Sequence, residues 1–354
     1  MIRQSWRRVL LGCKMPELSN FTTIRVGGEP KSLLEVASER ELFDACKQLW
    51  STGEDWFILG GGSNVVFDDD LSDLNIIKVV SKGIEITESN EYVFVKAQAG
   101  ESWDELVEFC VDRGYAGIEA ISGVPGTVGG SPVQNIGAYG QEVSETITKI
   151  SFLDYQTREE LVLENEDLNF SYRDSDIKRG RIGAIGWVEF RLQKLDGLSV
   201  PMASGQITNH LDKPYGSQLP LQDVRETVLK LRSSKGMVID ANDPNSVSCG
   251  SFFTNPVVDY IKSLEFPEDM QKWKMDEDSF KLSAGWLIEN AGVEKGFSLP
   301  GSKAAISQKH ALAITNTGGA TAAEVLELAR YVQERVASRW GVNLVPEPNL
   351  IGFN

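Results

Sequence analysis

Residues 60–62 are three consecutive glycines that directly follow a short apolar and aromatic segment, residues 56–59. Such a segment is typical of a buried strand, and glycines then allow positive φ angles and the close approach of another backbone. Successive N–H groups in a turn of this kind can hold a phosphate, and Ser63 and Asn64 add side-chain donors. A glycine-rich turn without a ligand is the alternative that this motif alone leaves open.

Two better-known phosphate-binding loops do not fit this motif. A dinucleotide fingerprint needs a further glycine that opens a helix, but here Val65 follows, and then three aspartates at residues 68–70 that are typical of a turn. A P-loop would end in Gly-Lys-Ser or Gly-Lys-Thr, and neither closes this stretch. Neither of these two phosphate-binding loops is therefore present.

Composition narrows the possible partners. The 354 residues are enough for two or three domains, and 35 basic against 51 acidic residues give a net charge of −16. This charge disfavours nucleic acid or an anionic membrane as a partner, so an anionic ligand needs a local pocket of basic side chains or backbone amides. Four scattered cysteines and two histidines predict no disulfide framework, no metal site and no Ser-His hydrolase, and they fit a reducing cytoplasm.

The chain begins with three arginines and a short apolar run within residues 1–14. A secretory signal needs roughly 7 to 15 apolar residues, so we expect residues 1–19 to form a disordered extension instead. No later window is apolar enough to predict a membrane span.

Hydrophobic periodicity predicts the elements around the glycine run. We expect a helix at residues 39–50, strands at 56–59, 76–80, 84–87 and 92–97, a helix that Ser102 opens and Gly114 ends, and a late helix that begins with the capping box of Thr321 and Glu324.

A second glycine-rich stretch occupies residues 121–140. It has too little apolar surface to fold alone, so it is either a flexible linker or a segment that wraps a ligand bound at the first glycine run. Flexible linkers are polar, whereas isoleucine, valine, proline and tyrosine are interspersed here, which favours the second interpretation.

Together these two stretches and later motifs resemble the UDP-N-acetylenolpyruvoylglucosamine reductase family. The motifs occur in that family's order and lie at residues 60–64, 126–130, 134–140, 171–175, 249–256, 283–289 and 346–352. The resemblance implies an α+β fold: an FAD-binding fold of the vanillyl-alcohol-oxidase type, built from two α+β subdomains, and a third α+β domain for the substrate. The implied boundaries are 20–80 and 81–212 for the FAD-binding subdomains, 213–338 for the substrate domain, and 339–354 for a C-terminal segment that returns to the active site.

The resemblance also implies the reaction. A cytoplasmic, monomeric flavoenzyme of peptidoglycan precursor synthesis would take hydride from NADPH onto FAD and pass it to UDP-N-acetylglucosamine enolpyruvate, giving UDP-N-acetylmuramate. We expect non-covalent FAD, because residues 60–64 and 122–140 contain no histidine or cysteine for attachment. The implied FAD-binding residues are Gly60, Gly61, Gly62, Ser63, Asn64, Ser122, Gly126, Thr127, Gly129, Gly130, Asn135, Gly137, Ala138 and Tyr139.

Three residues carry the implied chemistry. Arg173, which without the resemblance would be a surface ion pair, is implied to contact the carboxylate of the enolpyruvyl group. Ser251, otherwise a turn residue or helix cap, is implied to donate the proton, and Glu347, otherwise a solvated loop carboxylate, to help polarise the substrate. The chain departs from the family pattern at Cys249, where we expect a packing role rather than a redox-sensitive thiol, and after Glu347, where Pro348 and Asn349 replace the Val-Arg that the family often has.

Four further residues occupy positions that resemble nucleotide and diphosphate contacts: Tyr215, Lys235, Asn255 and Lys295. Surface lysines are common, so without the motifs each of these residues would be weak evidence for a binding site. Two other functions stay open: a flavin oxidase of the same fold that acts on a small hydroxy acid, and a flavin- or nucleotide-sugar-binding regulator without turnover. The Ser, Arg and Glu triad disfavours both.

Overall fold

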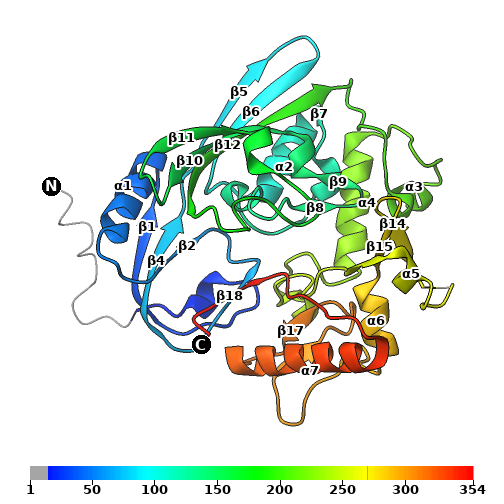
Figure 1. Cartoon of the computed structure of the whole chain (residues 1–354). Coiled ribbons are helices and arrows are strands. Elements are labelled where there is room, and N and C mark those ends of the chain that lie inside the picture. Colours follow the sequence, from blue (N-terminus) through cyan, green and yellow to red (C-terminus); the bar gives the residue numbers. More distant parts are fainter. Residues whose placement is uncertain (1–14, 269, 354) are drawn as a thin grey trace. The chain divides into compact units, whose positions relative to one another are not determined.

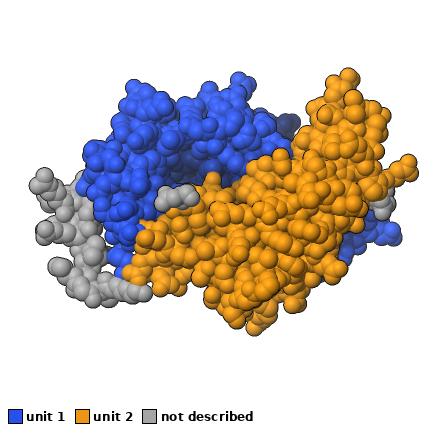
Figure 2. All heavy atoms as spheres, turned by 60° about the horizontal axis from the view of Figure 1, so that its bottom comes forward, with its two compact units in different colours: residues 1–15, 30–61, 72–233 blue, residues 16–29, 62–71, 234–354 orange. Residues whose placement is uncertain are grey.

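The computed structural model describes residues 15–268 and 270–353, and it divides into two compact units, coloured separately in Figure 2. Unit 1 contains residues 30–61 and 72–233, and unit 2 contains residues 16–29, 62–71 and 234–354. The boundary passes through the first glycine run, so Gly61 belongs to unit 1 and Gly62 to unit 2. Most of the expected N-terminal extension lies outside the described residues, and the first described element contains the fully buried Leu18.

An antiparallel sheet of six strands forms the centre of unit 1 (Figure 1). Its strand order is β11-β10-β12-β6-β5, and β7 pairs with β12. A second sheet has the order β1-β4-β2, in which β2 and β4 run parallel. The strands are β1 (Pro30–Val36), β2 (Trp56–Leu59), β4 (Leu71–Val79), β5 (Ile84–Glu88), β6 (Tyr92–Gln98), β7 (Tyr115–Ala116), β8 (Gly137–Ala138), β9 (Gln141–Glu142), β10 (Ile147–Asp154), β11 (Glu160–Glu164) and β12 (Gly183–Lys194).

The two helices that the apolar spacing predicted in unit 1 each bury one apolar face. Helix α1 (Glu39–Trp50) is capped by the Ser38 side chain and packs against β12, and α2 (Trp103–Asp112) is capped by Ser102. The other helices are α3 (Gly205–His210), α4 (Leu221–Ser233), and the short 3-10 helices η3 (Glu119–Ile121), η4 (Val128–Gly130), η5 (Val143–Glu145) and η6 (Asn165–Leu168). The expected elements of this unit are confirmed, with β4 beginning earlier than expected.

Unit 2 combines small sheets with helices (Figure 1). Strand β3 (Val65–Phe67) pairs in parallel with the C-terminal β18 (Asn349–Ile351). Helix α7 (Ala322–Trp340) begins with the predicted capping box, and Asp69 also accepts the N–H of Ala322 at 3.1 Å. The remaining elements are η2 (Leu18–Phe21), η7 (Pro244–Ser246), β13 (Val257–Asp259), α5 (Tyr260–Ser263), β14 (Lys272–Lys274), β15 (Ser279–Leu282), α6 (Ala284–Asn290), β16 (Ala304–Ile306) and β17 (Ile314–Asn316). Among the described residues, every helix is too short or too polar to cross a membrane.

Candidate active site

The two glycine-rich stretches meet backbone to backbone in unit 1. A Cβ atom on Gly61 would lie 2.6 Å from the Cα of Gly126, and one on Gly60 would lie 2.5 Å from Oγ1 of Thr127. Real Cβ contacts are longer than this, so side chains at these positions would push the two stretches apart. The glycines are therefore required for the close packing that the sequence suggested.

The second stretch is anchored to the start of α2. The Trp103 N–H donates to the Gly126 carbonyl at 3.1 Å, and the Gly129 N–H donates to the Ala99 carbonyl at 2.9 Å. The Asp104 carboxylate accepts the Gly123 N–H at 2.6 Å, and it pairs with the buried Arg225 of α4 at 2.7 Å. A segment held in this way is not a flexible linker. Sequence reasoning missed Asp104, because an acidic residue in the first turn of a helix is usually solvated.

Two non-glycine residues of this stretch adopt positive φ angles, which cost free energy and concentrate at functional sites. Asn135 has φ 48°, is buried, and donates to the Glu142 carboxylate at 2.7 Å and to the Ser171 carbonyl at 3.0 Å. Tyr139 has φ 49°, and burial raises the pKa of its phenol, while the charge of Arg232 lowers it. The backbone of this stretch is thus strained but firmly tied to its surroundings.

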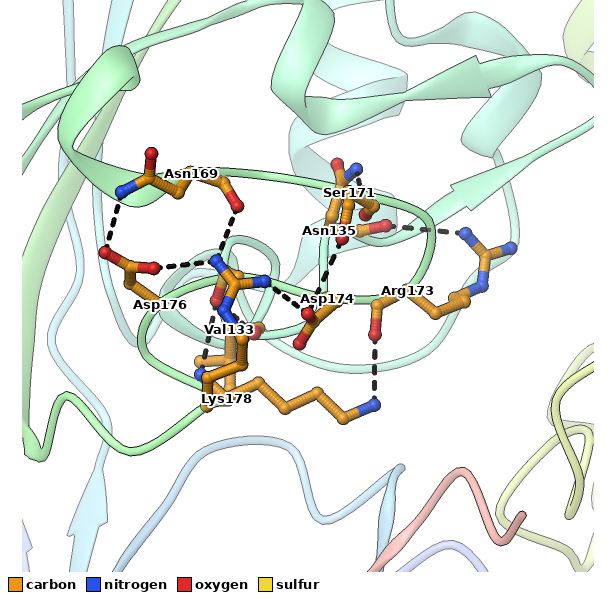
Figure 3. A network of polar contacts seen from close by, with 10 residues as sticks. Val133, Asn135, Asn169, Ser171, Arg173, Asp174, Asp176 and Lys178 are labelled. Carbon is orange, nitrogen blue, oxygen red and sulfur yellow. Dashed lines mark hydrogen bonds and ion pairs between the residues drawn. The ribbon is translucent and has the colours of Figure 1, made fainter. Parts of the chain in front are cut away.

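Arg173 is directed at the same stretch. It has φ 55°, and its guanidinium donates to the carbonyls of Asn135, at 3.4 Å, and Gly137. One of its nitrogens also lies 3.8 Å from the Glu142 carboxylate. The guanidinium is thereby held beside the expected FAD-binding residues of unit 1, as Figure 3 shows for Asn135.

The aspartates that flank Arg173 have a different partner (Figure 3). Arg179 pairs with Asp176 at 2.6 Å and also with Asp174. The hydrogen bond from Arg179 holds the pKa of the Asp176 carboxyl below its usual value. The surface ion pair that the sequence could suggest for Arg173 is therefore formed by Arg179, and the Arg173 guanidinium points to the other side of the loop.

Unit 2 brings the other two candidate catalytic residues together. The Glu347 N–H donates to the carbonyl of Phe252, the residue after Ser251, at 2.9 Å. The side chain of Asn64, which follows the first glycine run, donates to the Glu347 carbonyl at 3.3 Å, although the two residues are 283 positions apart. The Ser251 hydroxyl is half-buried and makes no hydrogen bond within the described residues, so it caps no helix or turn there.

Cys249 is a packing residue. Burial raises the pKa of its thiol to about 12, and the charge of Glu347 acts in the same direction. A thiolate is the reactive form of cysteine, so this thiol is unreactive at neutral pH. Cys46 and Cys110 are buried in the same way, and burial raises the pKa of each to about 12.

The expected nucleotide and diphosphate contacts belong to both units. Tyr215 belongs to unit 1, where 71% of its surface is exposed, and the other three belong to unit 2. Asn255 accepts the Ala284 N–H at the start of α6 at 2.9 Å, and Lys295 pairs with Glu289 at 3.4 Å. Asn255 and Lys295 therefore have contacts within unit 2. The binding roles of Tyr215, Lys235, Asn255 and Lys295 stay predictions.

Sequence reasoning also missed charged residues inside unit 1. Glu119 is fully buried and accepts the N–H groups of Gly117 at 2.6 Å and Val200 at 3.2 Å, and burial raises the pKa of its carboxyl. A lone acid within the apolar residues 118–121 was the signal that could have revealed it. Burial lowers the pKa of Arg232, and the charge of Arg173 does so further, whereas Tyr139 and Asp104 raise it.

Lys78 is a further residue that the sequence did not reveal. It lies on β4 opposite Leu59 of β2, and its ammonium group donates to the carbonyl of Gly60. A close-packed glycine backbone with a neighbouring cation suits an anionic cofactor such as FAD, whose two phosphates need amide N–H groups and positive charge. The residues of the candidate site therefore fit this cofactor.

Known proteins resemble this chain over nearly its whole length. A UDP-N-acetylenolpyruvoylglucosamine reductase of Leifsonia xyli is 44% identical over 96% of this chain and 98% of its own length. The chain belongs to the UDP-N-acetylenolpyruvoylglucosamine reductase family. A protein of the same name from a Mycobacterium species is 40% identical over 95% of both chains. The family model of the reductase C-terminal domain matches residues 243–351, which include Ser251 and Glu347, and that of an FAD binding domain matches residues 30–158, which include both glycine-rich stretches.

A solved structure supports the fold. The crystal structure of the UDP-N-acetylenolpyruvylglucosamine reductase of Thermus caldophilus matches with a TM-score of 0.63 and 24% identity, and the match covers 95% of this chain and 97% of that one. Together with the FAD-binding domain, it confirms the α+β FAD-binding fold that the motifs of this reductase family implied.

Proposed function

We propose that this protein reduces UDP-N-acetylglucosamine enolpyruvate to UDP-N-acetylmuramate with NADPH, in the synthesis of peptidoglycan precursors. It is an FAD-containing oxidoreductase, since it belongs to the reductase family and carries the FAD-binding domain. The observation that carries this function is the backbone packing of Gly61 against Gly126 within that domain, which forms the glycine cradle that the cofactor requires.

Bound FAD would supply the two-electron chemistry, as the carrier of hydride from NADPH to the methylene carbon of the enolpyruvyl group. The residues of the chain handle the charge that results. Hydride addition turns the methylene into a methyl group and leaves an electron pair on the adjacent carbon, delocalised into the carboxylate. The Arg173 guanidinium pairs with this carboxylate and stabilises the added charge.

Ser251 completes the reaction by donating its hydroxyl proton to that carbon, which gives the lactyl ether of the product. A hydroxyl has a high pKa, so it acts as an acid only toward a strongly basic enolate held close to it. Glu347, whose backbone is bonded to Phe252, helps polarise the carboxylate region of the substrate. The role of Ser251 rests on the family's motifs, and the roles of Arg173 and Glu347 rest also on the contacts of each residue within its own unit.

The proposal also covers the location, the oligomeric state and the roles of the domains. We place the protein in the cytoplasm, where NADPH and nucleotide sugars are available, and we propose a monomer without nucleic acid as a partner. The assignment of residues 20–80 and 81–212 to FAD and 213–338 to the substrate also stays a prediction.

A visible spectrum of the purified protein tests the function. We expect flavin absorption bands that NADPH bleaches and that the enolpyruvyl sugar restores under anaerobic conditions. Acid precipitation should release all the yellow colour into the supernatant, because the FAD is non-covalent. Rapid reoxidation by oxygen without any dependence on the sugar would instead indicate a flavin oxidase, and flavin bands without NADPH consumption would indicate a binding protein without turnover.

A further inference from the structure

Lys78 reaches the first glycine run from the neighbouring strand. In the parallel pair of β2 and β4 it lies opposite Leu59, the residue directly before Gly60. Its side chain is half-buried, and its ammonium group donates to the carbonyl of Gly60. An ammonium group has three N–H donors, so one carbonyl does not use its full capacity.

The charge of Lys78 is not neutralised by an ion pair. Within residues 15–268 and 270–353, no carboxylate lies within ion-pair distance of its ammonium group. Burial lowers the pKa of Lys78, the charge of Glu35 raises it, and that of Lys82 lowers it. A partly desolvated cation costs free energy unless an anion compensates it, and this cation persists in a chain of net charge −16.

The surroundings of this cation suit a diphosphate. Gly60 and Gly61 pack directly against Thr127 and Gly126, so the wall beside the ammonium group is mostly backbone. Backbone N–H groups can bind phosphate oxygens, and a lysine adds a point charge. We propose that Lys78 is a cofactor-binding residue, whose ammonium group pairs with the diphosphate of FAD at the first glycine run. This inference rests on the proposed function, and it assigns a residue outside the family motifs.

The competing explanation is that Lys78 only fixes the Gly60 carbonyl. Lys78→Gln separates the two roles, because glutamine keeps an N–H donor for the carbonyl and loses the charge. Lys78→Arg keeps the charge. Lys82→Gln is the matched control: it removes a nearby exposed lysine, which pairs with Glu101 at 3.1 Å, and so changes the net charge equally.

The test measures FAD release from the full-length holoprotein on dilution, by the fluorescence of the released flavin. We expect Lys78→Gln to raise the Kd for FAD by about 10- to 100-fold, as for the loss of one charge-assisted hydrogen bond, and Lys78→Arg to recover most of the affinity. Raising the salt from about 0.01 M to about 1 M should weaken FAD binding less in Lys78→Gln than in the unmodified protein.

Two results would overturn the inference. Lys78→Gln could hold FAD within about twofold of the unmodified protein with the same salt dependence, as a role confined to the Gly60 carbonyl requires. Alternatively, Lys78→Gln and Lys82→Gln could weaken FAD binding equally, which would indicate that the affinity depends on the net charge of the protein and not on a contact of Lys78. Both results leave the proposed function intact, whereas an unmodified protein that binds no FAD would refute the function itself.

Discussion

The two units hold their candidate catalytic residues by different means. In unit 1 the Arg173 side chain is itself part of the architecture, because its guanidinium bonds to carbonyls of the second glycine-rich stretch. In unit 2 the segment that carries the catalytic residue is held by backbone hydrogen bonds. Glu347 bonds to Phe252 through main-chain atoms, and Thr254 bonds to Val345 in the same way at 3.0 Å. Substitution of a catalytic side chain in unit 2 should therefore lower the reaction rate without a change in local structure. Substitution of one in unit 1 should change both the rate and the local structure.

The largest expected effect is that of Ser251→Ala, which tests whether a side-chain change in unit 2 affects the reaction alone. The variant removes the proton donor and leaves the backbone ladder between residues 252 and 347 intact. Reduction of the flavin by NADPH should proceed at nearly the normal rate. Reoxidation by the enolpyruvyl sugar should slow by about 10²- to 10⁴-fold, the usual contribution of a positioned general acid.

Stopped-flow absorbance at the flavin band separates these two half-reactions. Ser251→Cys serves as a companion variant and should recover part of the rate, since a thiol can also donate a proton. Equal loss of both half-reactions in the alanine variant would make Ser251 structural, and no loss in either would place the proton donor elsewhere.

An intermediate effect is expected for Arg173→Lys, which tests whether a side-chain change in unit 1 affects both the reaction and the local structure. Lysine keeps the charge but cannot offer the planar fork that bonds a carboxylate and neighbouring carbonyls at once. We expect kcat/KM for the enolpyruvyl sugar to fall by about 10- to 100-fold, mostly through KM, with a modest weakening of FAD binding. Steady-state kinetics and flavin release measure the two effects.

Arg179→Lys is the matched control, because Arg179 bonds to Asp174 and Asp176 instead of to the second glycine-rich stretch. Its kinetics should stay within about twofold of normal, as expected for exposed ion pairs. If Arg179→Lys raised KM as much as Arg173→Lys, the substrate role of Arg173 would be lost and the loop as a whole would be responsible.

Local signals in the sequence were enough to predict several helices and strands of the fold. The spacing of apolar residues located α1 and α2, and the capping box of Thr321 and Glu324 located the start of α7. These elements were predictable because each depends on residues a few positions apart. The ordered glycine and catalytic motifs likewise revealed the family before the structure did.

The directions of side chains and the register of strands were beyond the sequence. The partner of Asp174 and Asp176 is Arg179, not the adjacent Arg173, because the turn of the chain decides which guanidinium faces them. Lys78 became visible only through the register of β4 against β2. Neither a strand register nor the direction of a side chain can be read from one residue and its neighbours.

The smallest expected effect is that of Gly61→Ala, which tests how the glycine stretches of unit 1 are held. The added Cβ would lie 2.6 Å from the Cα of Gly126, a backbone atom that cannot rotate away. We expect the melting temperature to fall by an amount that corresponds to about 1–3 kcal/mol, with weaker retention of FAD. Gly205→Ala is the control, because its Cβ would meet nothing nearer than Nδ2 of Asn209 at 4.0 Å, and it should change neither property. If Gly61→Ala melted and retained FAD like Gly205→Ala, the two stretches would have room to separate, and close backbone packing would not be what builds the cofactor site.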